Sequence, residues 1–106
     1  MLDAGEKGKQ MRARVTQFKV RPDAIPAARA EIETMKDEIM ELHGMRQFLC
    51  VLNDSGDGYV VSLLDASEAP KEDAERIRAL WGRMAPHLEA TPAPSEYDVV
   101  AWWETE

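Results

Sequence analysis

The chain has 106 residues, which is enough for one domain. Its 20 acidic and 13 basic residues give a formal net charge of −7, which argues against nucleic acid or an anionic membrane surface as a partner, because both require a basic face. No apolar stretch approaches the roughly 20 residues that span a bilayer, and a single cysteine allows no intrachain disulfide. We expect a cytoplasmic protein in which residues 1–11 are a disordered tail and residues 12–106 form one domain.

The first predicted elements are a strand and a helix. The strand covers residues 12–21, where Thr16, Phe18 and Val20 share one face. The helix runs from about Ala24 to His43. Its apolar residues recur at intervals of three and four and form one stripe: Ile25, Ala28, Ile32, Met35, Ile39 and Leu42.

A hairpin and a second helix follow. Strands over residues 46–53 and 59–64 are separated by a turn that is rich in Asn, Asp and Gly. The second helix begins near Pro70, and Pro86 should kink or split it. Its stripe consists of Ala74, Ile77, Leu80, Trp81, Met84 and Leu88.

The last strand is predicted over residues 97–103, after a linker at 91–95. The resulting order, βαββαβ, places both helices on the same face of one sheet. The second, third and fourth strands are apolar on both sides, and the adjacent Trp102 and Trp103 should point to opposite faces of the last strand. A contiguous apolar sheet face marks an interface, so we predict a homodimer that pairs sheet against sheet.

Three segments have a characteristic order and spacing: His43-Gly44-Met45, Val61-Ser62-Leu63-Leu64-Asp65-Ala66-Ser67-Glu68-Ala69, and Leu80-Trp81 followed by Met84-Ala85-Pro86-His87-Leu88. In this pattern residues 12–103 resemble the antibiotic biosynthesis monooxygenase-like (ABM-like) group of the dimeric α+β barrel superfamily. The resemblance implies an α+β, ferredoxin-like fold with a four-stranded antiparallel sheet and two helices on one face. It also implies a homodimer and a small-molecule pocket between helices and sheet.

The same resemblance implies a function. It points to a protein that binds a small apolar organic molecule and acts as a cofactor-independent monooxygenase on an aromatic or polyketide-like substrate. One alternative is a non-catalytic binding or assembly module on the same dimer, and another is a haem-binding protein. Oxygenase and haem-degrading members often carry a Trp near the end of the third strand, where this chain has Leu64, and this difference favours the non-catalytic alternative.

Two histidines are the candidate catalytic residues. His43 closes the first predicted helix, and His87 follows Pro86 near the end of the second. A histidine at such a place is either a general base at a pocket mouth or a cation near the negative helix end. Aromatic and methionine side chains on the inner faces are the candidate pocket-lining residues. They are Phe18, Met35, Phe48, Trp81, Met84 and Trp102.

No metal site is predicted, because neither histidine has a His, Cys or carboxylate neighbour at metal-ligand spacing. No cofactor is expected, although haem ligation by a histidine stays open. Cys50 lies in an apolar run and is interpreted as a small buried hydrophobic residue. The basic residues around the first strand are interpreted as a solvated face or as partners of the acidic helices: Arg12, Arg14, Lys19 and Arg21.

Overall fold

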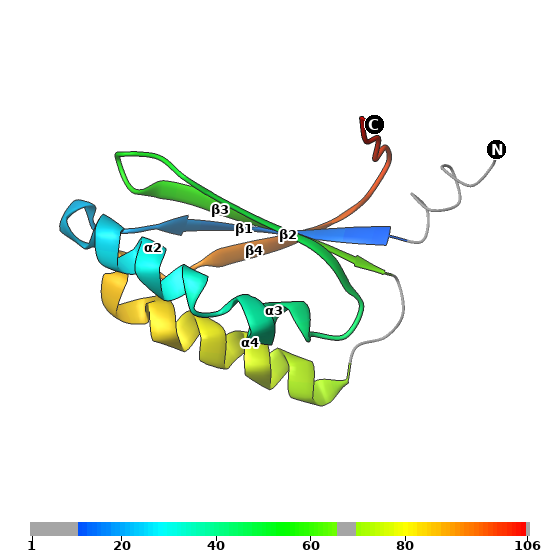
Figure 1. Cartoon of the computed structure of the whole chain (residues 1–106), viewed down its shortest axis with the longest axis horizontal. Coiled ribbons are helices and arrows are strands. Elements are labelled where there is room, and N and C mark those ends of the chain that lie inside the picture. The colour runs from blue at the N-terminus through cyan, green and yellow to red at the C-terminus, as the bar shows by residue number, and fades with distance from the viewer. Residues whose placement is uncertain (1–10, 66–69, 106) are drawn as a thin grey trace.

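The fold is a four-stranded antiparallel sheet with every helix on one side of it (Figure 1). The computed structural model describes residues 11–65 and 70–105. The strands are β1 (Met11–Lys19), β2 (Met45–Leu52), β3 (Asp57–Asp65) and β4 (Ala93–Asp98), in the spatial order β2-β3-β1-β4. The helices are η1 (Pro22–Ala24), α2 (Ile25–Glu33), α3 (Lys36–Met40), α4 (Lys71–Met84) and η2 (Ala85–His87). The predicted α+β class and the order βαββαβ are confirmed. Residues 1–10 of the predicted tail lie outside the described residues, and Met11 begins β1.

The single helix predicted from Ala24 to His43 is wrong, because the chain breaks it into α2 and α3. At the break the Thr34 hydroxyl donates to the Glu31 carbonyl at 2.6 Å, and the amide of Met35 donates to the Ile32 carbonyl at 3.0 Å. These shorter-range bonds tighten the turn in place of α-helical bonds. The apolar stripe nevertheless continues across the break, since Met35 and Ile39 are both buried.

The β2–β3 turn is fixed by one asparagine and one glycine. The Asn53 side-chain oxygen accepts hydrogen bonds from the amides of Ser55 and Asp57 at 3.0 and 2.9 Å. Gly56 has a φ of 93°, and a Cβ atom there would lie 2.1 Å from the carbonyl oxygen of Val20. Only glycine therefore suits this position. The turn that the sequence predicts is confirmed, and it packs against Val20, the residue after β1.

The last strand is shifted toward the N-terminus relative to the prediction. β4 pairs residues Ala93 to Asp98 with β1, so that the predicted linker contributes to the strand. Pro94 is tolerated because β4 is an edge strand with one unpaired side. Trp102 and Trp103 lie beyond the strand, and the Trp103 side chain is 84% exposed. The prediction that these two residues occupy opposite sheet faces is therefore wrong.

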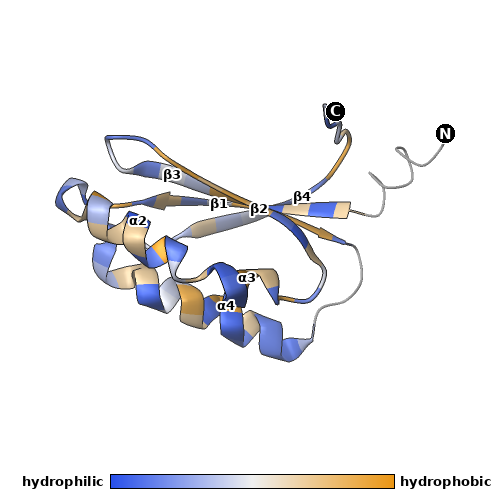
Figure 2. Ribbon diagram, viewed as in Figure 1, coloured by the Kyte–Doolittle hydropathy of each residue, from blue (hydrophilic) through white to orange (hydrophobic). Residues whose placement is uncertain are grey.

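The two faces of the sheet differ in their cover. Apolar residues recur along both strands and helices (Figure 2), and those between the two layers form the core, which includes Phe18, Val20, Ala28, Met35, Ile39, Val60 and Met84. The opposite face has no helix over it in the described part of the chain, and it exposes Leu49, Val51, Tyr59 and Tyr97. Within residues 11–65 and 70–105, no helix has the length and apolar character needed to cross a membrane.

Candidate binding cavity

A cavity lies between the sheet and the helices. The centre of a water-sized sphere can occupy about 70 Å³ of it. The described residues that line it come from β1, β2, β3, α2, α4 and the chain around α3. The cavity is therefore built from both apolar helix stripes and the helix-facing side of the three strands.

Five of the predicted pocket-lining residues lie on the cavity wall: Phe18, Met35, Phe48, Trp81 and Met84. The Phe18 and Trp81 ring centroids are 5.7 Å apart, with the ring planes inclined by 56°. This tilted pairing is a favourable aromatic arrangement and joins β1 to α4 across the wall. The sixth residue, Trp102, follows the end of β4 and is not among the lining residues.

The position of Phe18 depends on the glycine beside it. Gly58 is its direct partner on β3, and a Cβ atom at Gly58 would lie 2.4 Å from the Phe18 ring. The ring thus occupies the space that any other residue on β3 would fill. The absence of this one side chain places the Phe18 ring over the strand.

Three polar side chains share the otherwise apolar cavity wall. Arg14 and Ser62 are direct partners on β1 and β3, and Thr16 is two residues from Arg14 on the same face of β1. Thr16 and Ser62 are only 2% and 6% exposed. From the sequence, Arg14 is interpreted as part of a solvated face or as a partner of the acidic helices, and it is not placed in a cavity. Its alternation with Thr16 and Phe18 was the signal that could have placed it here.

Cys50 also lines the cavity, from β2. Its thiol is free and half-buried, and burial raises its pKa because a thiolate is poorly solvated there. A raised pKa is the opposite of what activates a nucleophilic cysteine. We therefore regard Cys50 as part of the apolar wall, as the sequence indicates.

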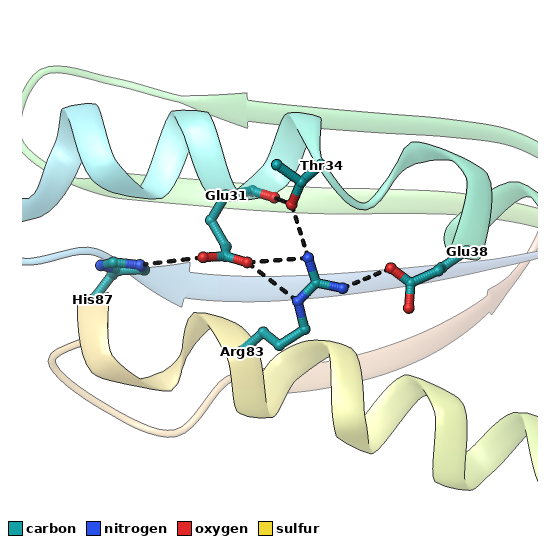
Figure 3. A network of polar contacts seen from close by, with 5 residues as sticks. All are labelled: Glu31, Thr34, Glu38, Arg83 and His87. Carbon is teal, nitrogen blue, oxygen red and sulfur yellow. Dashed lines mark hydrogen bonds and ion pairs between the residues drawn. The ribbon is translucent and has the colours of Figure 1, made fainter.

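Neither candidate histidine lines the cavity. His87 lies in η2, where its Nε2 is 4.0 Å from a Glu31 carboxylate oxygen (Figure 3). His43 is exposed after α3, and its backbone amide donates to the Asp73 carboxylate at 2.7 Å. An imidazole at either position is not in place to act as a base on a molecule inside the cavity.

Arg83 joins the helices on their outer side (Figure 3). From α4 it bonds to Glu31 at 3.1 Å, to the Thr34 hydroxyl at 2.8 Å and to Glu38 at 2.6 Å. Its pKa is raised, chiefly by the hydrogen bond to Glu38. Because Glu31 and Glu38 belong to α2 and α3, this cluster fastens both pieces of the broken helix to α4 beside the cavity.

Metal and haem ligands can be sought among the described residues. Within these ranges, no group of three or more His, Cys, Asp and Glu residues could hold a metal ion. Among the side chains that serve as haem axial ligands in proteins, the cavity wall includes Cys50, Met35 and Met84 but neither histidine. A second hollow of about 300 Å³ lies between α3 and α4, but its lining is charged and includes Glu38, Glu41, Arg76 and Arg83.

Comparison with known proteins identifies the fold. No protein-family model and no curated protein matches the chain. A solved structure from Bordetella bronchiseptica, provisionally named an antibiotic biosynthesis monooxygenase, aligns with a TM-score of 0.72 and 10% identity over 84% of this chain and 96% of that one. A second with the same provisional name, from Caulobacter crescentus CB15, aligns with a TM-score of 0.66 and 15% identity over 90% and 94%.

A third solved structure, a Nitrosomonas europaea protein of unknown function, aligns with a TM-score of 0.70 and 11% identity over 93% of this chain and 98% of that one. This chain has the ABM-like fold. The resemblance inferred from the sequence is thus confirmed for the fold. Sequence identities this low do not extend the likeness to activity.

Proposed function

We propose that the chain binds a small, largely apolar organic molecule in the cavity beneath Trp81. The observation that carries this proposal is a cavity whose wall includes aromatic and methionine side chains. The centre of a water-sized sphere can occupy about 70 Å³ of it. By that measure one water needs roughly 10–15 Å³, so the space is large enough for more than a single water. Apolar cavities with a few polar groups are typical small-molecule sites.

A pair of matched variants tests this proposal. Cys50→Phe places a ring inside the cavity, whereas Leu49→Phe places one on the opposite, exposed face of the same strand. With 1-naphthol as probe, we expect Cys50→Phe to weaken binding by at least about tenfold and Leu49→Phe to leave it unchanged. Equal affinity in both variants, measured by calorimetric titration, would place the binding site elsewhere.

Cofactor-independent oxygenation is the second candidate, supported by the aromatic cavity wall and by the fold shared with proteins of that provisional name. In such a reaction a methylene flanked by aromatic rings loses a proton, and the carbanion reduces O₂. A carbon–oxygen bond forms and the hydroperoxide loses water, so that one O₂ gives one ketone and one H₂O. The protein would supply a pocket that excludes water.

We do not assign the base for this reaction to either histidine, because neither lines the cavity. His87→Ala and His43→Ala should therefore keep any oxygen uptake with anthrone within about twofold of the unchanged protein. A large loss in either variant would restore that histidine as the base. Uptake no faster than in buffer would favour the alternative of a non-catalytic binding module, and a Soret shift on haem titration would favour haem binding.

A second copy of the chain is the partner that we propose for the exposed sheet face. Leu49, Val51, Tyr59 and Tyr97 form an apolar surface that a matching sheet would cover. Lys19 is polar on this face, but its ammonium pairs with Asp57 at 3.0 Å. A cytoplasmic location is part of the same proposal, supported by the free thiol of Cys50.

A further inference from the structure

We propose that the cavity binds its ligand in one orientation, with an oxygen substituent hydrogen-bonded by Arg14, Thr16 and Ser62 and an aromatic ring beside Phe18 and Trp81. The ligand class is then a neutral aromatic compound with one oxygen at its end, such as a phenol or an aromatic ketone. This inference rests on the proposed binding function and specifies its ligand.

The strand register brings the three polar residues together. Arg14 is the direct partner of Ser62, and Thr16 is the direct partner of Val60, the residue two positions before Ser62. Direct partners in an antiparallel sheet have Cβ atoms about 4.5–5.5 Å apart, and diagonal neighbours such as Thr16 and Ser62 lie about 7–8 Å apart. The three side chains therefore form one polar patch on the cavity floor.

The two hydroxyl groups are available to a ligand. Within residues 11–65 and 70–105, neither the Thr16 nor the Ser62 hydroxyl makes a hydrogen bond. Neither oxygen is fully buried without a partner, so each keeps some accessible surface. Each oxygen must therefore be open to the cavity that both residues line. Buried hydroxyls without partners are unfavourable, so a ligand oxygen at this position would satisfy them.

The charges around Arg14 favour a neutral ligand oxygen over a carboxylate. Arg14 donates to Glu96 at 3.4 Å, and Arg12 donates to the same carboxylate at 3.2 Å. Asp98 is the direct partner of Arg12 on β4, so two carboxylates balance two guanidinium groups on this side of the sheet. Arg14 retains further N–H donors for a ligand, but the surroundings offer no net positive charge to hold an anion.

The rest of the cavity wall accommodates the apolar body of such a ligand. Phe18 from the sheet and Trp81 from α4 present tilted rings, and Met35 and Met84 add adaptable apolar side chains. A ligand ring packed against these side chains is held by contacts that do not depend on its substituents. Selection of the oxygen then depends on the floor, since a hydrocarbon of the same shape leaves both hydroxyls unpaired.

The test compares 1-naphthol, naphthalene and 1-naphthoic acid as probes by calorimetric titration. We expect the unchanged protein to bind 1-naphthol at least about tenfold more tightly than either of the other two. Thr16→Val and Ser62→Ala should each weaken 1-naphthol binding and leave naphthalene binding unchanged. Ser95→Ala on exposed β4 is the matched control and should change neither affinity.

Each outcome of this titration decides one claim. If 1-naphthol and naphthalene bind equally well to the unchanged protein, the polar floor does not select an oxygen and this inference is overturned, while the proposed binding function stands. Tighter binding of 1-naphthoic acid would overturn the choice of a neutral ligand. If no probe binds, the proposed function itself fails. Should Thr16→Val not fold, Ser62→Ala provides the same comparison.

Discussion

At the scale of single residues, the shape of the cavity wall depends on side chains that are absent or small. Gly58 leaves room for the Phe18 ring, and Thr16 and Ser62 leave polar atoms open beneath it. Gly82 on α4 is different, because nothing lies within 4 Å of an added Cβ atom there. The two glycines therefore form a matched pair for mutation.

Gly58→Ala should destabilise the protein by about 1–3 kcal/mol, because the new methyl group displaces the Phe18 ring from its packed position. Gly82→Ala should stabilise it by about 0.5–1 kcal/mol, since alanine favours a helix over glycine. Urea unfolding of both variants measures the two changes. A neutral Gly58→Ala would mean that the Phe18 ring does not pack against β3 as described.

The raised pKa of the Cys50 thiol predicts a distinctive pH dependence. Reaction with iodoacetamide requires the thiolate, so its rate in the folded protein should still be rising at pH values where the rate in the urea-unfolded chain has levelled off. Because the folded-state pKa lies above the unfolded value, the contribution of the neutral thiol to stability is complete below the unfolded pKa and is lost as the pH rises through the folded pKa. Identical rate profiles for the two states would contradict a buried thiol.

At the scale of the elements, side-chain contacts decide where helices end. Arg83 bonds to both pieces of the broken helix, and Asp73 near the start of α4 accepts the His43 amide after α3. Neither contact follows from periodicity. The apolar stripe runs through Met35 without interruption, which is why the sequence predicts one helix where the chain forms two.

Asp73→Ala should destabilise the protein by about 1–3 kcal/mol, because it leaves the partly buried His43 amide without its charged acceptor. The Asp73 side chain is part of a residue only 5% exposed, whereas its neighbour Glu72 is exposed. Glu72→Ala is therefore the matched control and should change the unfolding free energy little. Equal effects of the two variants in urea unfolding would show that the contact to His43 has no stabilising role.

Part of the candidate site was predictable from the sequence, because strand alternation and helix periodicity set the direction of a side chain. Phe18 and Trp81 follow the alternation of a strand and the stripe of a helix, so their inward direction could be inferred. The place of Trp102 could not, because the end of β4 is set by its pairing with β1 and not by the apolar residues that follow. Arg14 was missed because its charge indicated a solvated face or a pairing with the acidic helices, although strand alternation places it on the cavity side.

At the scale of the whole molecule, the uncovered sheet face is the feature that one chain leaves unexplained. Leu49 is 58% exposed on a strand whose other face is in the core. Tyr59 and Tyr97 extend this surface across the sheet. Such a surface is rarely left in water, which is why we propose a second copy of the chain as its partner.

Light scattering at micromolar concentration should therefore give twice the 11.9 kDa mass of the chain. Leu49→Lys combined with Tyr59→Lys should reduce this to the single-chain mass, because two charges from each copy would be buried at the interface. Arg78→Glu on the outer side of α4 is the control and should not change the mass. A single-chain mass for the unchanged protein would remove the proposed dimer.

The central claim is that the cavity between sheet and helices is the ligand site, and methionine methyl NMR tests it most directly. Met35 and Met84 line the cavity, whereas Met40 on α3 is exposed and does not. On titration with 1-naphthol, the account predicts shifts of the Met35 and Met84 methyl signals and none at Met40. If 1-naphthol binds while the Met35 and Met84 methyl signals do not shift, the central claim is contradicted.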